Sequence, residues 1–185
     1  MIFGSDFTSP SLNQVLTPKM WAGDFSETST VVKDPATAQV RVALAFPDAY
    51  EIGMSHMGLK ILYQLLNARP EFLAERVYAP WLDAEALLRR HRIPLCSHES
   101  GLPLASFDIV GFTLQYEMSY VNILTMLDLG GIPLHSVERT LDHPLVIAGG
   151  PCAQNPEPIA PFIDVFVTGD GEPSLPVLCD LWRDL

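Results

Sequence analysis

Apolar residues gather in short runs along this 185-residue chain, and the clearest of them is VRVALAF at residues 40–46. Continuous apolar runs bounded by glycine or proline are typical of strands buried within a parallel sheet. These runs predict strands at residues 40–46, 75–79, 107–113, 145–148 and 165–168, of which the second is the weakest. Apolar positions at helical spacing, such as Leu59, Leu62 and Leu66, predict helices at residues 57–68, 84–91, 120–129 and 173–182.

The order of these elements predicts the fold class. It is βαβαβαβαβα, and strands that alternate with helices imply right-handed crossovers and a doubly wound parallel sheet. We therefore expect an α/β three-layer sandwich, flavodoxin-like, with strand order 2-1-3-4-5. Residues 40–185 form this domain. The polar, proline-broken residues 1–39 form an extension, which we expect to pack on the domain through the apolar spot at residues 20–23.

Unusual loops follow four of the predicted strands. They are residues 48–56, 114–118, 149–157 and 169–172, and the last two begin with glycine turns. Because the carboxyl ends of parallel strands share one edge of the sheet, these loops predict a ligand crevice at that edge. Turn geometry alone is the alternative explanation for the glycines.

Polar side chains in these loops are candidates for ligand contacts. His56 stands just before a predicted helix, where it could bind a metal or a ligand, or simply cap the helix. Glu51, Glu117 and Glu172 could contact a polar ligand together, although helix capping explains each of them individually.

Cysteine and histidine give weaker candidates. His91, Cys96 and His98 do not match the spacing of a standard zinc motif and lack a fourth ligand. Cys152 follows the double glycine, but no neighbouring base can be identified. Neither GxGxxG nor GxxxxGK[ST] occurs, and no catalytic residue is predicted for the chain.

Composition limits the possible partners and the cellular location of the protein. Hydrophobic residues make up 48% of the chain, enough for a sizeable core, and the net charge of -11 disfavours nucleic-acid binding by this segment. Three widely spaced cysteines form no disulfide framework, and no apolar run reaches the length of a membrane span. We expect a cytoplasmic protein without a membrane partner.

Four sequence blocks resemble a known family. They are FPDAYEIGMSHMGLKILYQLLN (46–67), AERVYAPWLDAE (74–85), IPLCSHESGLPLASFDIVGFTLQYEMSYVNILTMLDLGGIPL (93–134) and PLVIAGGPCAQNPEPIAPFIDVFVTGDGE (144–172). These blocks resemble the radical S-adenosylmethionine (radical SAM) proteins that carry an N-terminal cobalamin-binding-like domain. The resemblance covers roughly residues 17–185 and implies a downstream barrel whose CxxxCxxC motif holds a [4Fe–4S] cluster and S-adenosylmethionine. This chain has no such motif.

The resemblance also implies where a cofactor would bind. Cobalamin-binding domains often carry DxHxxG after the first strand, but Met54 and Ser55 precede His56, and Gly58 stands at the wrong spacing. By resemblance, Thr113 and Gly149-Gly150 would face the nucleotide tail of cobalamin. The loops and the resemblance together give these cofactor-binding candidates: Tyr50, Glu51, Gly53, Met54, Ser55, His56, Thr113, Leu114, Gln115, Glu117, Gly149, Gly150, Pro151, Gly169, Asp170, Gly171 and Glu172.

The resemblance thus implies a domain that holds a corrinoid, or shapes the substrate entrance, beside a radical SAM barrel of the same polypeptide. On this hypothesis the full-length protein is an enzyme, whereas the 185-residue segment alone is not catalytic. Two alternatives stay open: a degenerate structural or interaction module without a cofactor, and a stand-alone nucleotide- or flavin-binding domain.

Overall fold

Five parallel strands form one sheet in the order β2-β1-β3-β4-β5, as the sequence predicted. The computed structural model describes residues 31 and 33–185, so the proposed anchor at residues 20–23 lies outside the described residues. The strands are β1 Val40–Phe46, β2 Phe72–Tyr78, β3 Ile109–Thr113, β4 Leu145–Gly149 and β5 Val165–Val167.

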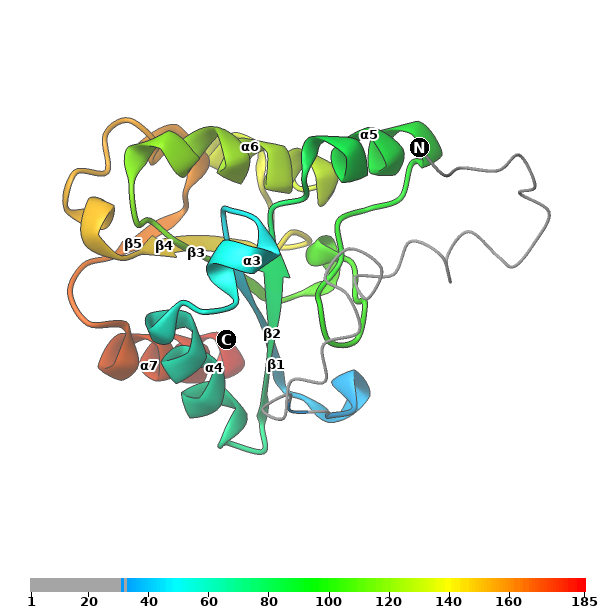
Figure 1. Ribbon diagram of the computed structural model, residues 1–185. Helices are drawn as coiled ribbons and strands as arrows, with labels where there is room; N and C mark the ends of the chain where they lie inside the picture. The colour runs from blue at the N-terminus through cyan, green and yellow to red at the C-terminus, as the bar shows by residue number, and fades with distance from the viewer. Residues whose placement is uncertain (1–30, 32) are drawn as a thin grey trace.

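Helices cover both faces of this sheet and complete a three-layer α/β fold (Figure 1). The longer helices are α4 Met57–Asn67 and α7 Gly171–Arg183 on one face, and α5 Leu82–His91 and α6 Tyr120–Leu129 on the other. The short helix α3 Tyr50–Gly53 follows β1. Each face buries its own apolar core. Within the described residues, no helix is both long and apolar enough to cross a membrane.

Short 3-10 turns make up the remaining regular structure. They are η1 Pro35–Thr37, η2 Leu104–Ser106, η3 Glu117–Ser119, η4 Ser136–Glu138, η5 Pro151–Gln154 and η6 Ala160–Phe162. The alternating order predicted a helix between the last two strands, and this was wrong, because only η5 and η6 lie there. Four prolines within residues 151–161 each lack the backbone N–H that a continuous helix would need.

The last strand also differs from the prediction of burial on both faces. β5 is an edge strand of three residues, and Val165 is 38% exposed. Its start is fixed by Asp164, which accepts hydrogen bonds from the Arg139 guanidinium and from Val146 N. The same guanidinium donates to the backbone carbonyl of Phe162. This buried arginine therefore ties β5 to the body of the sheet.

At the other edge, β2 is longer than predicted and all seven of its residues are buried, including Glu75 and Arg76. The loop after α5 covers this edge: His98 N donates to the Arg76 carbonyl, and the Glu99 carboxylate accepts from Arg76 N and Nε. Glu75 accepts hydrogen bonds from Ser97 and Ser100. The two charged side chains are buried because this loop pairs them.

Candidate functional site

A cavity of about 220 Å³ opens at the carboxyl edge of the sheet, on the face covered by α4 and α7. Its floor includes Leu44, Gly111 and Ile147, which lie side by side in one register across β1, β3 and β4. Gly111 has no side chain, so a hollow remains between its two neighbours. The position of this cavity is the usual position of a ligand in an open α/β sheet.

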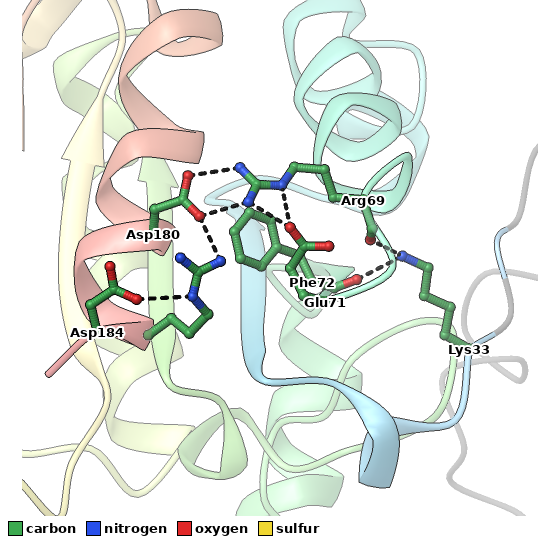
Figure 2. Close-up of polar contacts among 7 residues, drawn as sticks. Lys33, Arg69, Glu71, Phe72, Asp180 and Asp184 are labelled. Carbon is green, nitrogen blue, oxygen red and sulfur yellow. Dashed lines mark hydrogen bonds and ion pairs between the residues drawn. The ribbon is translucent and has the colours of Figure 1, made fainter.

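The N-terminal halves of two helices form the walls of the cavity. Leu59 and Leu62 of α4 and Leu175 of α7 line it. Arg69, which follows the C-cap of α4, joins the far end of that helix to α7. The Arg69 guanidinium lies between Asp180 of α7 and Glu71, with N–O distances of 2.6 and 2.5 Å (Figure 2). These bonds raise the pKa of Arg69 above its ordinary value. The arginine thus fixes the spacing of the walls from outside the cavity.

Glycines shape the mouth of the cavity. Gly150 has a φ of 107°, and a Cβ built there would lie 3.0 Å from the Leu114 carbonyl oxygen. The two loops cross closely because Leu114 N donates to the Gly149 carbonyl and Cys152 N donates to the Leu114 carbonyl. Gly169, with a φ of 93°, turns the chain after β5. Gly149 itself has room, since a Cβ there would meet Val167 O at an ordinary 3.4 Å.

His56 lines the cavity and also caps a helix. Its Nδ1 accepts a hydrogen bond of 3.1 Å from Leu59 N, at the start of α4. Because Nδ1 is the acceptor in this bond, the proton of the neutral ring lies on Nε2. The structure therefore shows that His56 Nδ1 caps helix α4.

The three predicted glutamates share the carboxyl edge but do not gather around the cavity. Glu172 lines it together with Asp170. Glu51 accepts a hydrogen bond of 3.3 Å from Trp81 Nε1, and Glu117 is an exposed residue of η3. A joint contact of all three carboxylates with one small ligand is therefore not favoured.

About half of the predicted site residues line the cavity, and their role in binding stays a prediction. Those in the lining are His56, Thr113, Gln115, Gly149, Gly150, Gly169, Asp170, Gly171 and Glu172. Those outside it are Tyr50, Glu51, Gly53, Met54, Ser55, Leu114, Glu117 and Pro151.

Some of the residues outside the lining have a structural explanation. The Tyr50 ring packs edge-on against Tyr78, with ring centroids 5.2 Å apart. A Cβ at Gly53 would lie 2.7 Å from the same Tyr78 ring, so close packing requires glycine at this position. Leu114 is fully buried in the core.

The sequence pattern did not predict the apolar part of the lining. It comprises Leu44, Gly58, Leu59, Leu62, Gly111, Phe112, Ile147, Val167 and Leu175. Most of these residues have the pattern of ordinary core positions. Gly111 gave a usable signal, because glycine inside a strand often marks a site where another group approaches closely.

Cysteines do not assemble into a metal site in the part of the chain that the structure describes. Cys96, Cys152 and Cys179 are all free, and no group of three or more His, Cys, Asp or Glu could hold a metal ion in residues 31 and 33–185. The weak zinc candidate of His91, Cys96 and His98 is therefore not formed.

The sequence matches a known protein family. Residues 58–185 match the family described as "Radical SAM proteins, N-terminal". The chain belongs to this family. An uncharacterized protein of Methanocaldococcus jannaschii is similar, with 26% identity over 140 residues, which cover 72% of this chain and 24% of the relative. This radical SAM N-terminal domain thus matches about a quarter of the length of that relative.

Proposed function

We propose that this chain is a cobalamin-binding-like domain of a radical SAM enzyme and that its cavity receives the nucleotide tail of a corrinoid. The observation that carries the proposal is the glycine-floored cavity at the carboxyl edge. An apolar cavity of about 150 Å³ already binds benzene. A volume of about 220 Å³ therefore suits a bicyclic aromatic base, while the much larger corrin ring would stay outside.

The lining offers complementary contacts for such a tail. Leu44, Gly111 and Ile147 present an apolar floor for a flat ring. Thr113 and Gln115 line the same cavity, and Gln115 Nε2 donates a hydrogen bond of 2.5 Å to Thr113 Oγ1, which orients both side chains. When bound, the corrinoid would supply a cobalt centre able to carry a methyl group.

A [4Fe–4S] cluster does not fit the described residues, because their free cysteines do not assemble into a metal site. The proposal therefore assigns the cluster and S-adenosylmethionine to a barrel elsewhere in the same polypeptide. The family match to the N-terminal part of radical SAM proteins supports this assignment. On this proposal the described chain positions a cofactor and does not perform the radical step.

A module that has lost its cofactor is the second candidate. His56 uses Nδ1 to cap α4, and the motif that would present it to cobalt is missing. Such a module would shape the substrate entrance of the barrel without binding cobalamin.

Reconstitution of the full-length protein with hydroxocobalamin separates the two candidates. After desalting, we expect the wild type to retain corrinoid absorbance and Gly149→Val to lose it, because the added side chain narrows the lining, while its Cβ meets Val167 O at an ordinary 3.4 Å. Gly150→Val would be a poor probe, since its positive φ strains any side chain. Ala105→Val, at an exposed position of η2, adds bulk away from the cavity as the control.

Absence of corrinoid from the wild type would overturn the proposal and favour the second candidate. Equal retention by the wild type and Gly149→Val would show that the corrinoid binds elsewhere. Circular dichroism of each variant separates loss of binding from loss of folding.

A further inference from the structure

Large apolar side chains are exposed around the carboxyl edge on the α5 and α6 side, away from the cavity lining. We call them the apolar rim: Ile52, Trp81, Leu82, Tyr116, Met118 and Val121. Trp81 is 60% exposed and Met118 86% exposed. Trp, Tyr and Met are enriched in protein interfaces, and clustered apolar exposure marks interaction sites.

Hydrogen bonds join the parts of the rim into one surface. The loop after β1 lies between them: its Glu51 bonds to Trp81 on one side, and its Asp48 accepts a hydrogen bond from Tyr116 OH on the other. Asn122 Nδ2 also donates to the Pro47 carbonyl, at 2.9 Å. The rim therefore does not consist of isolated side chains on independent loops.

The charge around the rim is of one sign. Each loop at the carboxyl edge carries an acidic residue, among them Glu51, Asp83 and Glu117, and residues 47–56, 79–85, 114–121, 150–161 and 168–174 contain no lysine or arginine. A two-fold contact between two copies of this edge would place like charges against each other. The surface is better matched to a partner that is apolar at its centre and basic around it.

We infer that the apolar rim is the docking surface for the remainder of the same polypeptide, which presents a basic surface to it. This inference rests on the proposed function, in which a barrel of the same polypeptide adjoins this domain. The chain spans 24% of the length of its relative, so most of a protein of that size lies outside the structure. A covalently attached partner also has an effective concentration in the millimolar range, which favours it over a separate protein.

Site-specific photo-crosslinking in the full-length protein tests the rim. Trp81 or Met118 is replaced by p-benzoylphenylalanine, and the products are mapped by mass spectrometry. We expect crosslinks within one polypeptide, from both positions, to residues beyond 185. Leu141 is the control, because it is 94% exposed but lies before β4 at the amino edge, where we expect no such crosslinks.

Crosslinks between two copies, or none from either rim position, would overturn the inference. Met118→Lys adds a second measurement: it should expose the junction after residue 185 to limited proteolysis, whereas Leu141→Lys should not. The crosslinking is repeated without corrinoid and in Gly149→Val, which separates the test of the rim from the test of cobalamin binding. Crosslinks without cofactor retention would contradict cobalamin binding alone, and retention without crosslinks would contradict the rim alone.

Discussion

Gly111 offers a test in which stability and ligand binding should change in opposite directions. Its φ is not positive, and a Cβ built there would meet Ile147 Cγ1 at 3.4 Å, an ordinary van der Waals contact. Glycine inside a strand costs roughly 0.5–1 kcal/mol relative to alanine because it loses more conformational freedom on folding. Gly111→Ala should therefore raise the free energy of unfolding by about that amount.

The same methyl group would occupy the hollow between Leu44 and Ile147 on the cavity floor. A ligand ring forced to share this space meets an overpacked site, which typically costs about 1–3 kcal/mol. Corrinoid affinity should then fall by about 5-fold to 150-fold. Urea denaturation followed by circular dichroism measures the first effect, and absorbance titration with hydroxocobalamin measures the second.

Two results would refute this reasoning. A loss of stability in Gly111→Ala would mean that the strand needs glycine for its own packing. A stability gain with unchanged affinity would mean that the ligand does not contact this floor. Ala105→Val, which adds bulk at an exposed turn, should leave affinity unchanged.

Three further predictions concern the scaffold. Arg139→Met should lower the free energy of unfolding by about 3–5 kcal/mol in urea denaturation, because it removes the buried cation that pairs with Asp164. Arg89→Met removes one partner of an exposed pair and should lower it by no more than about 1 kcal/mol. Equal losses in the two variants would contradict this prediction. Burial raises the pKa of the Cys179 thiol from 9.0 to about 12, so the thiol ionises first in the unfolded chain and stability is lost as pH rises from 9 to 12. In alkaline denaturation, Cys179→Ala should make the loss of stability with pH less steep. An unchanged dependence on pH would contradict this prediction. His56→Asn should retain the α4 cap, while His56→Ala should lower the free energy of unfolding by about 0.5–2 kcal/mol. If the stable His56→Asn variant loses corrinoid, the histidine ring contacts the cofactor.

The sheet was predictable from the sequence because its central strands are continuous apolar runs. The edge strands were less predictable for opposite reasons. β2 was predicted to begin at Glu75, yet it begins at Phe72. Glu75 and Arg76 interrupt its apolar run, and their burial depends on a loop distant in sequence that binds them. β5 has an apolar sequence but is partly exposed, since nothing in a local pattern tells an edge from a centre.

The candidate site was predictable where it depends on turn chemistry and not where it depends on packing. The glycine turns at Gly149-Gly150 and Gly169 indicated the mouth of the cavity. The floor required the register that aligns Leu44 with Gly111 and Gly111 with Ile147, and register depends on strands far apart in the chain. The role of Arg69 also depends on a residue far along the chain, because its partner Asp180 lies in α7, and this contact could not be deduced from the neighbours of Arg69 in the sequence.

The charge at the cavity mouth affects which ligand the proposed site would accept. Asp170 and Glu172 lie at the start of α7, where the backbone of a helix otherwise favours a phosphate. Two carboxylates there oppose the terminal phosphate of a flavin mononucleotide, which carries nearly two negative charges, more strongly than the singly charged phosphodiester within the nucleotide tail of a corrinoid. The amide groups around a corrin ring are neutral and donate hydrogen bonds, so they suit these carboxylates better. We therefore expect the full-length protein to retain hydroxocobalamin but not flavin mononucleotide, and retention of flavin alone would reverse this argument.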